Sequence, residues 1–222
     1  MSDGNSPATA PRASRKALLL ALLIGLAAGV LTAVIMLAVP GSNGTRVETS
    51  GKALIGGPFS LLDATGKRVT ENDFAGRPML VYFGFTNCPD VCPAGLQVIA
   101  AALDRLGSDT AGKVAPLFIT VDPERDTPEI LGQYVKSFHS NIVALSGSVD
   151  DILGVTKAYR VYVKKVPDET DPTQYSVDHS SFMYLMDGKG AFVRHFPHSV
   201  DAAVLAEELS KAVAAEAKVP AT

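Results

Sequence analysis

The 222-residue sequence contains only two cysteines, no tryptophan and no excess of basic residues. Two cysteines are too few for a disulfide-stabilised mini-protein, and a chain of this length can build a core without such bonds. Lys and Arg number 20 against 23 Asp and Glu, a net charge of −3, so the basic surface typical of nucleic-acid binding is missing. An apolar content of 47% also excludes disorder of the whole chain.

Apolar residues are concentrated in one segment near the N-terminus. Residues 17–39 carry no charge, and only Gly25, Gly29 and Thr32 among them are not apolar. As a helix with ~1.5 Å rise per residue they would span ~34 Å, enough for the ~30 Å hydrocarbon core of a bilayer. The segment therefore predicts a single N-terminal transmembrane helix.

The residues around this segment predict its orientation. Arg12, Arg15 and Lys16 precede it, so the positive-inside rule keeps the N-terminus in the cytoplasm and exports the rest of the chain. A cleaved signal peptide remains the alternative, although its apolar core is usually ~7–15 residues long, and it would export the same domain. The tail is too short and too poor in Arg for a mitochondrial transit peptide, which favours a bacterial inner membrane with the domain in the periplasm. The predicted parts are a tail at 1–16, an anchor at 17–39, a tether at 40–53 and a domain at 54–217.

The exported domain alternates short apolar runs with segments of helical periodicity. Strands are expected at 59–62, 68–70, 79–85, 114–121, 142–145, 181–186 and 191–195. Helices are expected at 89–106, with Pro89 in the first turn and Gly107 as the cap, and at 126–138, 148–159 and 200–217. The polar stretch 164–176 is expected to be an exposed loop. This order predicts an α/β fold with a central mixed sheet flanked by helices and an N-terminal hairpin extension, and it resembles the thioredoxin fold.

The two cysteines lie where the central strand passes into the first long helix, in the sequence TNCPDVCP. At this i, i+4 spacing Cys88 and Cys92 would share one helix face, and the positive helix N-terminus favours thiolates. Three interpretations stand: a structural disulfide, a redox pair, or a metal site, since two thiolates select soft Cu(I) or zinc. A disulfide here would close a very short loop and add little stability. The thioredoxin motif itself is C-x-x-C, usually after a tryptophan, and this chain has neither feature.

A third metal ligand would come from the four histidines. His139 and His195 are expected far from the cysteine end of the sheet, and His198 in a solvated connection. His179 comes just before the strand at 181–186, where thioredoxins hold a cis-proline that shields their cysteines. An imidazole at that position can face the thiols, which makes His179 the candidate ligand.

Four segments together closely resemble the Sco/SenC family of membrane-anchored copper chaperones. They are 82–93 (YFGFTNCPDVCP), 121–128 (VDPERDTP), 159–162 (YRVY) and 177–180 (VDHS), in matching order and spacing within a stretch from about 57 to 196. The resemblance implies a thioredoxin-like fold that binds one copper ion, Cu(I) or Cu(II), through Cys88, Cys92 and His179.

The resemblance also implies a function and partners. It implies a metallochaperone, not an enzyme, that delivers copper to the dinuclear copper site of cytochrome c oxidase subunit II during oxidase assembly. Other copper chaperones or thiol reductases are further expected partners. Some family members look more like thiol reductases, so reduction of a partner's cysteines by Cys88 and Cys92 stays open as the alternative.

Two acidic positions beside the expected site have open roles. Asp178 is expected either to orient the His179 imidazole or to offer a charge to a docking partner. Asp122 follows a strand at the edge where ligands bind. For residues 122–127, turn and helix-cap geometry is the expected role, with Asp126 and Glu129 forming a capping box.

Overall fold

The computed structural model describes residues 25–26, 54–171 and 173–218. The predicted tail, anchor and tether therefore lie outside the described residues, except for Gly25 and Leu26, which are helical. No helix in the described part of the chain is long and apolar enough to cross a membrane. All the other described residues belong to one compact unit within Gly51–Thr222.

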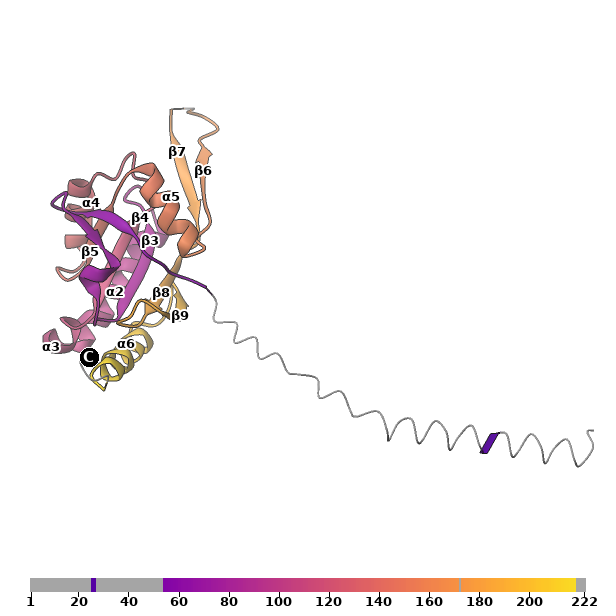
Figure 1. Ribbon diagram of the computed structural model, residues 1–222. Coiled ribbons are helices and arrows are strands. Elements are labelled where there is room, and N and C mark those ends of the chain that lie inside the picture. The colour runs from indigo at the N-terminus through magenta and orange to yellow at the C-terminus, as the bar shows by residue number, and fades with distance from the viewer. Residues whose placement is uncertain (1–24, 27–53, 172, 219–222) are drawn as a thin grey trace, which may run out of the picture. The chain divides into compact units, whose positions relative to one another are not determined.

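A seven-stranded mixed sheet forms the centre of this unit (Figure 1). Its strand order is β2-β1-β5-β4-β3-β8-β9. Strands β3, β4 and β5 run parallel, whereas β1 joins β5 and β8 joins β3 in antiparallel pairs. The bounds are β1 Ser60–Asp63, β2 Arg68–Thr70, β3 Met79–Gly84, β4 Ala115–Thr120, β5 Val143–Ser146, β8 Phe182–Met186 and β9 Phe192–Pro197. The predicted central mixed sheet, with a hairpin at each end of the domain, is confirmed.

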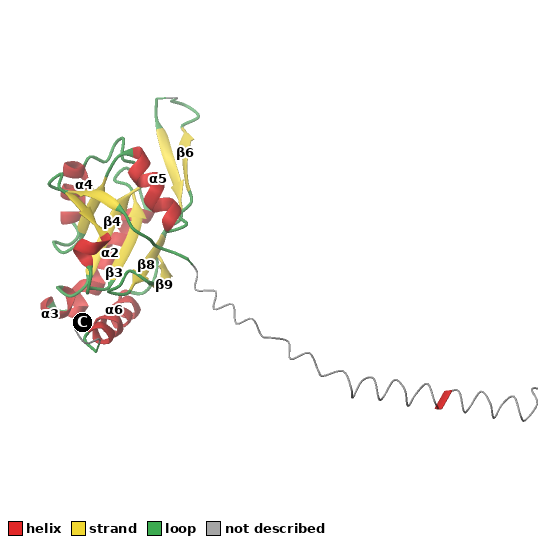
Figure 2. Cartoon of the chain, viewed as in Figure 1, coloured by secondary structure: helices red, strands yellow, loops and turns green. Residues whose placement is uncertain are grey.

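Helices cover both faces of the sheet (Figure 2). On one face, the ring of Tyr82 packs under α2 and the ring of Phe118 lies 6.0 Å from that of Tyr134 in α4. On the other face, the ring of Phe83 lies 5.4 Å from that of Tyr159, which caps α5. The bounds are η1 Glu71–Phe74, α2 Val91–Leu106, α3 Ser108–Ala111, α4 Pro128–Lys136, α5 Val149–Ala158 and α6 Ala202–Glu216. Every residue of β3 and β4 is buried between these layers, which explains their uninterrupted apolar sequences.

The stretch predicted as an exposed loop contains a two-stranded ribbon instead. Strand β6 (Val163–Pro167) pairs antiparallel with β7 (Tyr175–His179), and Figure 1 shows this ribbon projecting from the body. The Tyr175 ring packs against the Lys165 ammonium of β6 at 4.7 Å and against the Arg125 guanidinium at 3.9 Å. The Arg125 contact comes from another segment, so local composition does not reveal it. His179 is consequently the last residue of a strand, not part of a loop.

Two predicted helix starts also differ from the structure. Helix α2 begins at Val91 after the N-cap Asp90, so Pro89 lies before the helix and not in its first turn. Helix α4 is capped by Thr127, whose hydroxyl accepts from the Ile130 N–H at 3.3 Å, and Pro128 is its first residue, whereas the helix was expected to begin at 126. The expected capping box of Asp126 with Glu129 is wrong, because the Asp126 side chain is buried and bonded elsewhere.

Candidate metal centre

The two cysteines occupy different positions at the carboxyl end of β3. Cys92 lies in the first turn of α2 and is fully buried, whereas Cys88 lies in the preceding loop and is half-buried. The prediction that the two cysteines share one helix face is therefore wrong. Both are free thiols, and the Sγ of Cys88 accepts from the backbone N–H of Cys92 at 3.4 Å. The Cys88 sulfur thus accepts from one of the backbone N–H groups that have no partner within the helix at its start.

Gly84 makes room for the buried cysteine. A Cβ atom at this position would lie 2.8 Å from the Sγ of Cys92 and 2.7 Å from the Phe118 ring, closer than atoms can pack. The absence of a side chain at the end of β3 therefore allows the sulfur to rest directly against the sheet.

His179 reaches the cysteines from the end of β7. Its Nε2 lies 3.7 Å from the Sγ of Cys92, while its Nδ1 lies 3.1 Å from the carbonyl oxygen of Ser180. A carbonyl only accepts, so Nδ1 carries the proton of the neutral ring and Nε2 presents its lone pair towards the thiol. The Phe85 ring packs edge-on against the imidazole at 5.9 Å between centroids.

The electrostatics of Cys88 and His179 fit the needs of a soft metal, whereas Cys92 would have to lose its proton when the metal binds. Donation from the thiol and backbone N–H of Cys92 lowers the pKa of Cys88 to about 5, so this sulfur is a thiolate at neutral pH. The same hydrogen bond and burial raise the pKa of Cys92. Burial lowers the pKa of His179, which keeps its imidazole neutral. Thiolate and neutral imidazole are the forms that ligate metals.

The spacing of Cys92 and His179 suits a shared ion. With a metal–sulfur bond of ~2.3 Å and a metal–nitrogen bond of ~2.05 Å, two atoms 3.7 Å apart subtend ~115° at the metal. That angle lies between tetrahedral and trigonal. Among the residues that the structure describes, however, no three His, Cys, Asp or Glu side chains stand close enough to hold an ion as they are.

The two predicted aspartates do not touch this triad. Asp178 is exposed on β7, and the ring nitrogen it was expected to orient contacts the Ser180 carbonyl instead. Asp122 is completely buried and accepts from Arg125 and from the hydroxyl of Tyr175 at 2.7 Å.

The other histidines stay apart from the cysteines. The His139 ring lies 3.6 Å from Asp104 near the end of α2. The His195 ring, on β9, packs 5.1 Å from the Phe182 ring on β8. His198 lies in the connection that follows β9, and its backbone N–H donates to the carbonyl of Ser181. Of the four histidines, His179 is therefore the one whose ring lies beside a cysteine sulfur.

Several contributors to the site escaped prediction. The Ser180 carbonyl is a backbone group, which carries no residue-type signal. Phe85 and Gly84 were recognised only as members of a buried strand. Asp126 accepts from the N–H and the hydroxyl of Thr86, and its position among charged residues suggested a helix cap instead.

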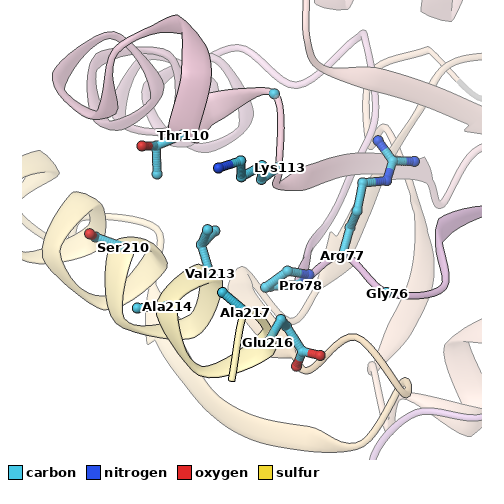
Figure 3. Close-up of a pocket in the computed structure, with 11 residues that line it drawn as sticks. Gly76, Arg77, Pro78, Thr110, Lys113, Ser210, Val213, Ala214, Glu216 and Ala217 are labelled. Carbon is cyan, nitrogen blue, oxygen red and sulfur yellow. The ribbon is translucent and has the colours of Figure 1, made fainter. Parts of the chain in front are cut away.

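A separate pocket of about 520 Å³ lies at the other end of the sheet (Figure 3). It is bordered by Pro78, which precedes β3, and by Lys113 and Val213, whereas the cysteines follow the opposite end of β3. The triad and this pocket are therefore distinct features of the molecule.

Several named proteins are similar in sequence to this chain. A family model described as SCO1/SenC matches residues 47–214. The chain is 47% identical over 155 residues to "Protein SCO1 homolog 1, mitochondrial" of Arabidopsis thaliana, covering 69% of this chain and 46% of that protein. It is 45% identical over 152 residues to "Protein SCO1 homolog, mitochondrial" of Homo sapiens, covering 68% of this chain and 50% of that one. The match thus spans about half the length of these relatives.

Solved structures agree with the fold. Bradyrhizobium japonicum ScoI with copper bound has a TM-score of 0.67 and 44% identity, covering 71% of this chain and 99% of that one. Yeast Sco1 with copper bound has a TM-score of 0.66 and 40% identity, covering 75% and 91%. The family model and the matched fold lead to one conclusion: this chain belongs to the SCO1/SenC family.

Proposed function

We propose that the protein is a copper chaperone that carries one copper ion on Cys88, Cys92 and His179. The observation that carries the proposal is the approach of the His179 Nε2 to the Cys92 Sγ at 3.7 Å, beside the Cys88 thiolate. Copper-bound Sco structures at 40–44% identity support it. Cys88 completes the ligand set by rotating its sulfur away from the Cys92 N–H.

The ligand set suits both oxidation states of copper. Cu(I) is soft and is satisfied by two thiolates in an open coordination, which allows a partner's thiolates to take the ion by ligand exchange. Cu(II) is better satisfied when the imidazole nitrogen of His179 is added. The neutral ring held by the Ser180 carbonyl is ready for that role without a change of tautomer.

We infer the recipient and the location from the family relationship. The recipient is the dinuclear copper site of cytochrome c oxidase subunit II, loaded during oxidase assembly. The predicted anchor at 17–39 holds the domain on the periplasmic side of a bacterial inner membrane. Asp178, exposed beside the ligand His179, is available to a docking partner.

Copper titration of the full-length chain tests the proposal. The reduced protein in detergent is titrated with Cu(I) against a competing chelator, and then mixed with the soluble domain of subunit II. We expect one copper per chain, no binding by the Cys88→Ser/Cys92→Ser double variant, and movement of the ion to subunit II. A reduced wild-type chain that binds no stoichiometric copper would overturn the proposal.

The thiol asymmetry also favours a second candidate, reduction of a partner disulfide. The Cys88 thiolate would attack a partner sulfur, forming a mixed disulfide and releasing one partner thiolate. Cys92 would give its proton to the partner thiolate released first and attack Cys88, releasing the second thiolate and leaving a Cys88–Cys92 disulfide. The partner gains two electrons and the pair loses two. This chemistry does not use His179, so His179→Ala would leave it intact while impairing Cu(II) binding.

A further inference from the structure

Two buried aspartates follow β4. The Asp126 N–H donates to the Asp122 carbonyl at 2.9 Å, but the two carboxylates bind different groups, none of which is a cysteine or His179. Asp122 and Asp126 are both completely buried, although a buried carboxylate is costly unless its oxygens are well bonded. Both lie in the segment 121–127, between β4 and α4. The partners of each side chain explain why this cost is accepted.

Asp126 binds the start of the cysteine loop. One carboxylate oxygen accepts from the Thr86 N–H at 3.0 Å and from the Thr120 hydroxyl at 2.7 Å, and the other accepts from the Thr86 hydroxyl. The carbonyl of Asp126 accepts from the Ser146 hydroxyl at 2.7 Å, which attaches the same residue to β5. Thr86 lies two residues before Cys88, so this carboxylate holds the cysteine loop to two central strands.

Asp122 binds the strand that carries the histidine. It accepts from the Tyr175 hydroxyl at 2.7 Å and from the Nε of Arg125. Arg125 in turn donates to the Tyr175 carbonyl at 3.0 Å and covers the Tyr175 ring at 3.9 Å. Tyr175 is the first residue of β7 and His179 is the last, so this cluster fixes the strand on which the imidazole stands.

We propose that the segment 121–127 positions the two halves of the copper site, each through the carboxylate of a different aspartate. Asp126 sets the cysteine loop, and Asp122 with Arg125 sets β7 and thereby the distance from His179 to the sulfurs. The inference rests on the proposed function and adds positioning residues to it. A purely structural role would lower stability without distinguishing the oxidation states of copper. The positioning role makes the Asp122 arm matter for Cu(II), which uses the imidazole, more than for Cu(I).

Tyr175→Phe is the most selective test, because it removes only the hydroxyl that Asp122 accepts from. Cu(I) and anaerobic Cu(II) affinities are measured on the reduced full-length chain in detergent. We expect the Cu(II) dissociation constant to rise about tenfold or more and the sulfur-to-copper charge-transfer band to shift, as for other changes next to metal ligands. The Cu(I) constant should stay within about twofold, since the thiolates are untouched. Tyr162→Phe is the matched control, because Tyr162 is an exposed residue, with 58% of its surface accessible.

Thr86→Val tests the other arm. It removes the hydroxyl bonded to Asp126 and should weaken Cu(I) and Cu(II) together, whereas Thr86→Ser keeps the hydroxyl and should restore both. Circular dichroism would be used to check that each variant is folded.

Two outcomes overturn this inference while leaving the proposed function standing. One is wild-type Cu(II) affinity and spectrum in folded Tyr175→Phe. The other is an equal loss of Cu(I) and Cu(II) in that variant. A wild-type chain that bound no copper would instead overturn the proposed function, and this inference with it.

Discussion

At the scale of the residue, the two cysteines have different chemistry despite their common motif. Cys88 is half-buried and accepts a backbone N–H, whereas Cys92 is fully buried against the sheet. One sulfur is therefore an accessible thiolate and the other a protected thiol. This asymmetry suits stepwise ligand exchange, since the accessible sulfur can engage a partner first.

The lowered pKa of Cys88 predicts a distinctive pH profile of alkylation. Because thiolate forms above the pKa, the rate for the reduced apoprotein with iodoacetamide should rise through about pH 5 and then level off. An ordinary thiol reaches half its maximal rate near pH ~8.5. Cys88→Ser should abolish the fast reaction, because Cys92 is buried and its pKa is raised. A midpoint near that of an ordinary thiol would contradict this description.

Gly84 predicts a stability change of known sign. Gly84→Ala places a methyl group 2.8 Å from the Cys92 sulfur and should lower the free energy of unfolding by about 1–3 kcal/mol. Gly154→Ala is the matched control, since Gly154 is exposed in α5 with no atom within 4 Å of the added carbon. It should raise stability by up to ~1 kcal/mol. Urea denaturation measures both, and equal effects of the two changes would refute the packing argument.

The residue types were enough to propose the candidate ligands but not the groups that surround them. Cys88, Cys92 and His179 could be proposed because few side chains offer soft donors, and the structure brings the three segments to one place. The carbonyl of Ser180 could not be predicted, because every residue has one. Asp126 was misassigned because the same side chain suits a helix cap and a buried anchor, and only the tertiary contacts distinguish them.

At the scale of the element, the strands with continuous apolar sequences were predicted and the ribbon was not. Strands β3 and β4 are buried on both faces, so their apolar runs identify them. The β6–β7 ribbon alternates weakly, and the Tyr175 contacts with Arg125 and Lys165 help to hold it. The register of the ribbon sets Val163 opposite His179 and so fixes the backbone position of the histidine. A prediction of an exposed loop contains no such register.

The start of α5 allows a test of an element that supplies no ligand to the proposed copper site. The Ser148 hydroxyl accepts from the Asp151 N–H at 3.1 Å, and the Asp151 carboxylate accepts from the Ser148 N–H at 3.0 Å. Ser148→Ala should lower the free energy of unfolding by ~1 kcal/mol, as lost N-caps do. Copper affinity should not change, and a change in affinity would mean that α5 is coupled to the site.

At the scale of the whole molecule, three distant chain segments converge at one end of the parallel strands. The loop after β3 brings the cysteines, the loop after β4 brings the anchoring aspartates, and the ribbon brings His179. Ligand sites at the carboxyl ends of parallel strands are typical of such sheets, which is why the location could be predicted. The hydrogen bonds that join residues 121–127 to the other two segments are made by side chains, so they could not be predicted without the structure.

The most direct test of the central claim compares His179→Ala with the wild type in the reduced, full-length chain. Copper stoichiometry and affinity are measured anaerobically for Cu(II) by its charge-transfer band and for Cu(I) by chelator competition. We predict that the variant loses at least about tenfold in Cu(II) affinity while keeping Cu(I) binding and two titratable thiols. Cu(II) binding of wild-type strength and spectrum in the variant would contradict the assignment of His179 as a ligand.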